Sequence, residues 1–232
     1  MHQPPVFIGD FQISEPMTTL TDLLVAAVCF YGYYQLNQRK IGGRIGWYVK
    51  YYLLMMCLST FFGGLLGHGF QHLVGFNWKI PGWLFGMYSL LFLERASIIQ
   101  ASTLLEPKTT TFLKFFNIIE IIAFTIIVLW TLDFIYVGIH SAVAVLLVVL
   151  PLQIFIYRKT KSAASYQMLL GVGWAFVAYL IFISKFSLHT FFNHLDIAHI
   201  FMALAAWKFY QGGLRLDDNL EKHHEPSLIE AA

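Results

Sequence analysis

The chain has 232 residues, of which 58% are hydrophobic and only 12% are charged, and its formal net charge at pH 7 is +2. Soluble domains carry about 25% charged residues, so this composition excludes an ordinary soluble domain. The small net charge, without a dense basic cluster, argues against a nucleic-acid partner. Long uncharged runs along the chain instead predict an all-α fold, a polytopic membrane protein with the lipid bilayer as its partner.

Seven apolar segments divide the chain. Residues 1–17 lack the basic and apolar regions of a secretory signal peptide, so the first apolar segment must act as its own insertion signal. We expect an N-terminal extracytoplasmic segment (1–17), a seven-helix transmembrane domain (18–213) and a cytoplasmic tail (214–232). The expected spans are residues 19–37, 50–72, 81–102, 112–132, 134–157, 166–184 and 196–212.

The charges of the connectors predict the orientation. Lys and Arg cluster after the first, third and fifth spans, whereas the connectors after the second, fourth and sixth carry only Lys79 and Lys185. By the positive-inside rule, the N-terminus lies outside and the C-terminus is cytoplasmic, which requires an odd number of spans. The sequence therefore predicts a seven-transmembrane-helix bundle, an integral multi-pass protein of the cell membrane.

Histidines and a carboxylate mark the outer ends of two spans. His68 and His72 lie four residues apart near the end of the second span, and Asp196 and His199 lie three apart at the start of the seventh. Such spacings place each pair on one helix face. The predicted orientation brings all four to a similar outer depth, where ionisable side chains need partners. We therefore predict a metal site, most plausibly for zinc, with His68, His72, His199 and Asp196 as ligands.

Other polar residues of the spans receive weaker assignments. His194, Tyr88 and Ser89 are possible second-shell residues around the metal. Glu94 and Arg95 are expected to form a snorkelling pair near the inner surface. Glu120, in the middle of the fourth span, has no assigned role.

The layout resembles a known superfamily. Seven spans, an outside N-terminus, a His late in the second span and the stretch Ile197 to Trp207 in the seventh resemble the CREST membrane hydrolases. These include the alkaline ceramidases and the adiponectin-receptor-like proteins. The family's second-span Ser-x3-His corresponds here to His68-x3-His72. In its seventh-span His-x3-His, Leu195 takes the first position, so one His is relocated to the second span.

The resemblance implies a zinc-dependent hydrolase that acts on a lipid amide or ester. Three His and an open coordination place would let zinc acidify a water molecule and polarise the substrate carbonyl. The sequence identifies no catalytic general base, and Asp196 as a fourth ligand would close the site. The alternatives are a b-type haem protein, with the glycines beside His68 making room for the macrocycle, and a receptor-like or structural seven-span protein without catalysis.

Overall fold

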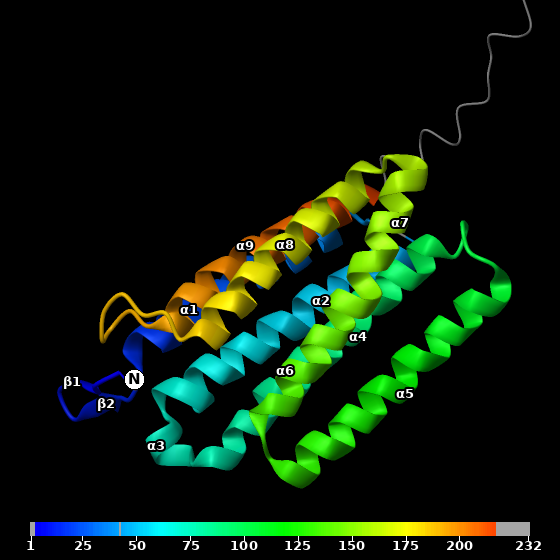
Figure 1. The fold of residues 1–232 in the computed structure, drawn as a ribbon. Helices are drawn as coiled ribbons and strands as arrows, with labels where there is room; N and C mark the ends of the chain where they lie inside the picture. The colour runs from blue at the N-terminus through cyan, green and yellow to red at the C-terminus, as the bar shows by residue number, and fades with distance from the viewer. Residues whose placement is uncertain (1–2, 42, 217–232) are drawn as a thin grey trace, which may run out of the picture.

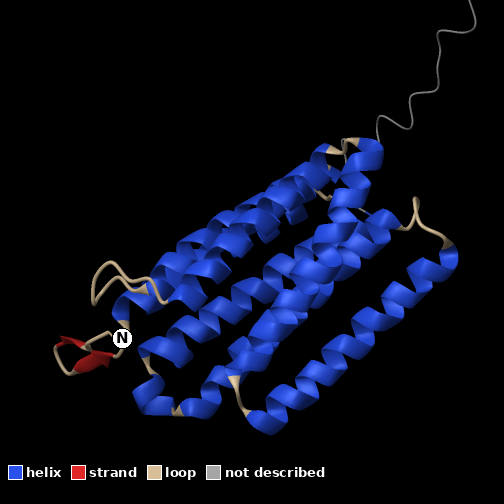
Figure 2. Ribbon diagram, in the orientation of Figure 1, coloured by secondary structure: helices blue, strands red, loops and turns tan. Residues whose placement is uncertain are grey.

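The computed structural model describes residues 3–41 and 43–216, so most of the predicted cytoplasmic tail lies outside the described residues. The predicted all-α fold class is confirmed, apart from one short antiparallel hairpin (Figure 2). In chain order the elements are β1 (Val6–Ile8), β2 (Phe11–Ile13), α1 (Pro16–Gln38), α2 (Gly43–Phe62), a π-helical segment η1 (Gly63–Gly69), α3 (Gln71–Val74), a 3-10 turn η2 (Phe76–Trp78), α4 (Lys79–Ala101), α5 (Pro107–Thr131), α6 (Phe134–Ala142), a π-helical segment η3 (Val143–Val149), α7 (Leu150–Thr160), α8 (Ala163–Ser184) and α9 (His194–Leu214).

The long helices run side by side in one elongated bundle (Figure 1). Helix α9 packs against α8 and α1, α1 packs against α2, and α2 packs against α4. Helix α5 lies at the edge of the bundle, where it contacts α4 and α6. The hairpin projects beyond the end of the bundle where α1 begins.

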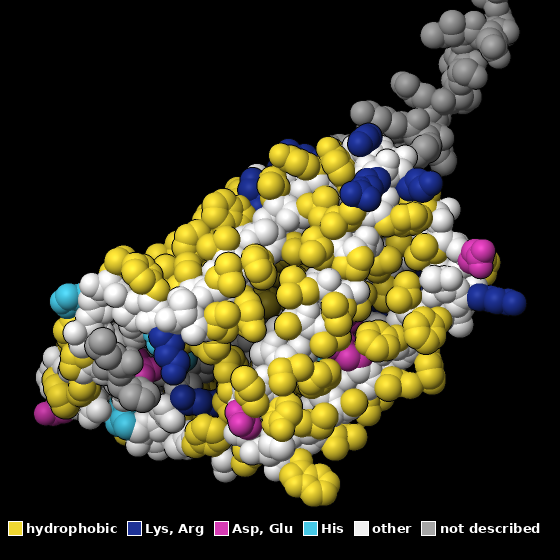
Figure 3. Space-filling view, in the orientation of Figure 1, with side chains coloured by type: hydrophobic (Ala, Val, Ile, Leu, Met, Phe, Trp, Pro, Cys, Tyr) yellow, Lys and Arg dark blue, Asp and Glu magenta, His cyan; other side chains and the backbone are white. Residues whose placement is uncertain are grey.

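Four helical runs in the described residues are long and apolar enough to cross a membrane: Gly43–Gly69, Pro107–Thr131, Phe134–Thr160 and Ala163–Ser184. Hydrophobic side chains also cover most of the bundle's side in Figure 3. Helices α1, α4 and α9 have 23, 23 and 21 residues. They carry the buried ionisable side chains of Asp22, Glu94 and Asp196, which lower their hydropathy.

The end of the second helical run differs from the expectation for His68 and His72. The run widens into π-helix at Gly63–Gly69, and the N–H of Phe70 donates to the carbonyl of Leu65 at 2.7 Å. The helix then stops, and His72 belongs to the separate short helix α3. The two histidines therefore do not share one α-helical face. The wider π turn and the break at Phe70 undo the spacing rule on which that expectation rested.

Close packing of α1 against the π-helical segment holds this end together. A Cβ at Gly64 would lie 2.8 Å from the Cβ of Asp22 and 3.3 Å from the carbonyl oxygen of Thr19. The hydroxyl of Thr19 donates to the carbonyl of Gly64 at 3.2 Å, and the N–H of Ser14 donates to the carbonyl of Gly69 at 2.9 Å. A glycine is needed at position 64 because the two backbones meet there.

We expect Gly64→Ala to destabilise the protein. The added methyl group overlaps Asp22 and must push α1 away, and such overpacking costs about 1–3 kcal/mol. The measurement is the thermal unfolding midpoint of the purified protein in detergent. Gly173→Ala is the matched control, because nothing lies within 4 Å of a Cβ at Gly173 in α8. An equal midpoint for both variants would contradict the close approach.

Candidate functional site

Two histidines from distant parts of the chain face one carboxylate at the hairpin end of the bundle. Nε2 of His199, on α9, lies 3.3 Å from Oδ1 of Asp22, on α1. Nε2 of His68, on η1, lies 3.9 Å from Oδ2 of the same Asp22. We call Asp22, His68 and His199, with their neighbours Glu15 and Thr21, the His-Asp cluster. The structure thus brings together two of the four predicted ligands.

The second nitrogen of each imidazole is held by a polar group. Thr21 Oγ1 donates to the backbone, with Met17 O at 3.0 Å and Thr18 O at 3.1 Å. Its oxygen therefore accepts from Nδ1–H of His199, at 3.0 Å. Nδ1 of His68 contacts Oε2 of Glu15, and an ionised carboxylate only accepts, so Nδ1 of His68 donates.

These hydrogen bonds assign the tautomers. With Nδ1 protonated, a neutral ring at His68 or His199 would direct its Nε2 lone pair at Asp22. Three acceptor groups then face one another, and a positive charge between them would relieve the repulsion. The side chains of Asp22 and His199 are 7% and 12% exposed and that of His68 is 22% exposed, so solvent reaches the cluster from the His68 side.

Asp196 has a different set of contacts from those expected of a ligand. Its carboxylate is fully buried and accepts from Thr18 Oγ1 at 2.9 Å, Gln3 Nε2 at 2.7 Å and the backbone N–H of Asn193 at 2.7 Å. Asn193 and Asp196 form a reciprocal capping box at the start of α9. The carboxylate therefore ties the N-terminal residues and α1 to α9, and the side chain that contacts Nδ1 of His199 is Thr21.

The other predicted site residues lie against different partners. His72 Nδ1 lies 2.9 Å from Ser14 Oγ, on the exposed side of α3. The ring of His194 packs at 6.1 Å from that of Phe182. Ser89 donates to the carbonyl of Gly86 within its own helix, and Tyr88 is exposed on the bundle surface. A role for these residues at a metal stays a prediction.

Sequence reasoning missed Asp22, Glu15 and Thr21. The signal was available, because the first apolar segment is predicted to start at the same end as His68 and His199, so a residue near its start is expected at their depth. Asp22 is the single acid of that span. What spacing could not show is that α1 is the helix lying between the other two.

The fit of a metal ion can be tested on the distances. Ligands bound to zinc at about 2.0 Å in a tetrahedron lie about 3.3 Å apart. The contact between His199 and Asp22 has this length, and that between His68 and Asp22 is longer. Within residues 3–41 and 43–216, no three His, Cys, Asp or Glu side chains converge closely enough to hold a metal ion. The donor chemistry fits, and His68 must move inward to complete the set.

Comparison with protein families places the chain. The family described as "Family of unknown function (DUF6962)" has a model that matches residues 17–218. The chain belongs to this family. The match to DUF6962 includes Asp22, His68 and His199 and begins just after Glu15. No curated protein and no solved structure matches the chain.

In this DUF6962 member we expect Asp196→Ala to lower stability by more than an ordinary cap does. Each buried donor left without its partner costs about 1–3 kcal/mol, and this change strands those of Thr18, Gln3 and Asn193. The control is Asp133→Ala, which removes an exposed cap on Ile135 N of α6 and should cost ~1 kcal/mol. Thermal unfolding in detergent measures both, and equal losses would show that the buried contacts add nothing.

Proposed function

We propose that the protein crosses the membrane seven times. The spans are the four apolar runs together with α1, α4 and α9, which at 21 to 23 residues reach the length of about 20 that a bilayer requires. The acidic residues of these three helices point inward. Asp22, Glu94 and Asp196 are 5%, 0% and 0% exposed, as expected of ionisable groups within a bilayer.

The two ends of the bundle differ in charge, which supports an outside N-terminus. The connections from α1 to α2, from α4 to α5 and from α7 to α8 lie at one end of the bundle, together with the C-terminal end of α9. Ten Lys and Arg residues lie in or near these regions: Arg39, Lys40, Arg44, Lys50, Lys108, Lys114, Arg158, Lys159, Lys161 and Arg215. Lys79 and Lys185 lie at the other end, with the hairpin and the His-Asp cluster. The positive-inside rule makes the hairpin end extracytoplasmic.

At this outer end we propose a zinc-dependent hydrolase that acts on a lipid amide or ester. The observation that carries the proposal is the approach of Nε2 of His68 and Nε2 of His199 to the carboxylate of Asp22, at 3.9 and 3.3 Å. Two imidazoles and one carboxylate make a three-ligand set of the kind used by catalytic zinc sites, which keep one place open. Asp22 thus replaces His72 and Asp196 of the sequence-based ligand set.

The chain's own residues have separate roles around this set. When bound, zinc supplies Lewis acidity, polarising a carbonyl and acidifying a water molecule. Glu15 and Thr21 hold the two imidazoles in the ligating tautomer, as second-shell acceptors do. Glu15 is also the carboxylate beside the more exposed histidine, so it can accept a proton from water at the cluster and return it to a leaving group.

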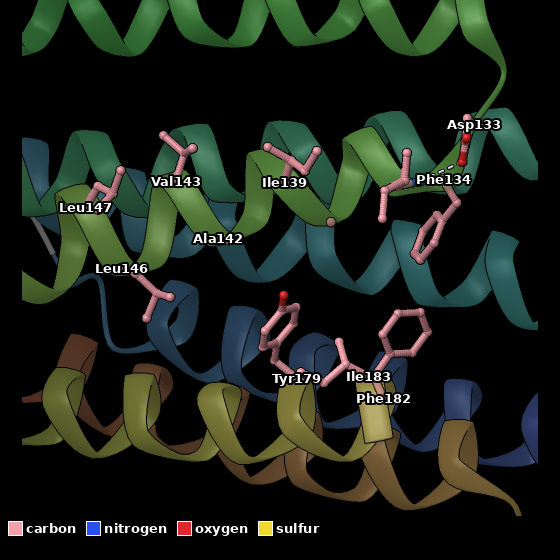
Figure 4. A pocket seen from close by; sticks show the side chains of 12 residues that line it. Asp133, Phe134, Ile139, Ala142, Val143, Leu146, Leu147, Tyr179, Phe182 and Ile183 are labelled. Atoms are coloured by element: carbon pink, nitrogen blue, oxygen red, sulfur yellow. Dashed lines mark hydrogen bonds between the residues drawn. The ribbon is translucent and has the colours of Figure 1, made fainter. Parts of the chain in front are cut away.

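An apolar groove separate from the His-Asp cluster, none of whose residues line it, offers a place for a lipid chain. The groove, of about 540 Å³, lies between α6 and η3 on one side and α8 on the other. Figure 4 shows Phe134 and Leu146 directed toward α8, where Tyr179 and Phe182 lie on the opposite side of the groove. Its size is typical of a small-molecule site. Because both walls belong to helices apolar enough to span a membrane, an acyl chain from the surrounding lipid is the natural occupant.

The packing of the glycines favours this proposal over the haem alternative. Gly64 and Gly69 lie against α1, where added Cβ atoms would come within 2.8 Å of Asp22 and 3.0 Å of Thr19. The space beside His68 is therefore occupied by α1 rather than open for a macrocycle.

The metal content of the purified protein tests the ligand set. We expect a single zinc per chain by elemental analysis, and its loss in His68→Ala, His199→Ala and Asp22→Asn, together with loss of hydrolysis of a fluorescent lipid amide or ester. His72→Ala and the exposed-loop control His189→Ala should keep zinc. Glu15→Gln should weaken zinc binding by roughly 10–100-fold, as loss of an orienting partner does.

Two results would reject the proposal. One is wild-type protein that binds no zinc even when zinc is added. The other is zinc that persists when His68 and His199 are both replaced by alanine, since these supply two of the three ligands. Haem absorbance in zinc-free protein would instead support the alternative, in which the same histidines bind haem.

Cysteine labelling tests the topology. In a Cys57→Ser background, Asp10→Cys in the hairpin turn should react with a membrane-impermeant maleimide on intact cells. Glu106→Cys, in the connection from α4 to α5, should react only after permeabilisation, because we place it inside. Cys29 is fully buried and should stay silent in both. Labelling of both positions from outside would contradict the orientation.

A further inference from the structure

A second group of ionisable side chains lies within the helices and has no part in the proposed hydrolase. Glu94 on α4, Glu120 on α5 and His140 on α6 are 0%, 5% and 0% exposed. Nε2 of His140 lies 3.7 Å from Oε1 of Glu120, and its ring lies against Phe124 at 5.4 Å. Glu120 is about 20 Å from one end of α5 and about 17 Å from the other, at 1.5 Å per residue. We call these three residues the interior acid cluster.

A relay of amide and guanidinium groups holds one side of the cluster. Arg95 donates from Nε to Asn117 Oδ1 at 2.8 Å and from Nη2 to the carbonyl of Lys114 at 2.9 Å. The amide nitrogen of Asn117 is thereby turned to Glu94 and donates to its Oε2. The expected snorkelling pair of Glu94 and Arg95 is therefore not formed, because Arg95 binds α5 and Glu94 points into the bundle.

The remaining polar atoms of the cluster have no donor. The carboxyl groups of Glu94 and Glu120 face each other closely enough for one to donate to the other when protonated. As two ionised acceptors they complete no bond, and Glu94 Oε1 and both oxygens of Glu120 lack hydrogen-bond partners, as do both ring nitrogens of His140. Buried acceptors left unpaired in this way are costly, and two facing carboxylates do not both ionise.

The charges of the cluster lead to the same conclusion as its hydrogen bonds, namely that one proton is missing. The charged and titratable side chains facing the cluster are Glu94 and Arg95 on α4, Glu120 on α5 and His140 on α6, while η3 adds only Ala, Val and Leu. Two ionised carboxylates against one guanidinium leave one excess negative charge in an apolar interior. An ionisable group placed there needs a partner of opposite charge or must be neutral.

We propose that the interior acid cluster is a proton-binding site within the membrane. One proton bridges the carboxyl groups of Glu94 and Glu120, with neutral His140 beside Glu120 as the next acceptor to which it can pass. A proton suits this site because it needs only two acceptors, and Glu94 Oε1 and both oxygens of Glu120 are buried acceptors without a donor in the described ranges. The proposal stands on α4, α5 and α6 and does not depend on zinc at the His-Asp cluster.

Infrared difference spectroscopy of the full chain in nanodiscs tests the bound proton. At neutral pH, the spectrum of wild type minus Glu120→Gln should show loss of the C=O stretching band of a protonated carboxylic acid, shifted in D₂O. The exposed-loop control Glu106→Gln should show loss of carboxylate bands only. Loss of carboxylate bands without a carboxylic acid band in Glu120→Gln would overturn the proposal.

Thermal stability and the effect of sodium distinguish a bound proton from a required negative charge and from a bound metal cation. Glu120→Gln should keep the thermal unfolding midpoint, because its amide can donate to Glu94 as the protonated carboxyl group does, whereas Glu120→Leu should lower it. An equal fall in both variants would mean that the negative charge is needed, against the proposal. The acid band should be the same in sodium and in sodium-free buffer. A band that sodium abolishes would identify a metal cation as the ligand and overturn the proton site.

Discussion

The contact of α1 with the π-helical end of the second run is the constraint on which the hairpin end of the molecule depends. Because Gly64 has no side chain, α1 approaches until Asp22 lies directly against it. This approach places the carboxylate between His68 from one side and His199 from the other. A residue of any other size at position 64 would separate these three groups, and the cluster would lose its shared centre.

A second network fixes α9 relative to α1. The buried carboxylate of Asp196 collects hydrogen bonds from the N-terminal segment through Gln3, from α1 through Thr18, and from its own helix start through Asn193. Gln3 also accepts from the backbone N–H of Met17 at the start of α1. The rigid register that results lets Thr21 meet His199, so a structural carboxylate supports a chemical site three residues away on the same helix.

The two buried clusters show how a bundle of apolar helices accommodates ionisable groups. At the hairpin end, each imidazole has a polar neighbour on Nδ1 and solvent approaches through His68. In the interior, Asn117 donates to one oxygen of Glu94, while Glu120 lies 3.7 Å from His140 and has no hydrogen-bond donor among the described residues. We propose a metal cation for the first arrangement and a proton for the second. Burial without full pairing is the property common to both.

The sequence by itself determined the helical class and the apolar runs, and it predicted that His68, His199 and Asp196 lie near the same end of the bundle, because composition, hydrophobic length and loop charge act locally along the chain. It could not determine the partners of these residues. The π turn that separates His72 from His68, the capping contacts of Asp196 and the entry of Asp22 between two histidines all depend on how closely neighbouring helices approach. That distance is set by packing between segments far apart in the chain. Residue spacing along one helix contains no information about such packing.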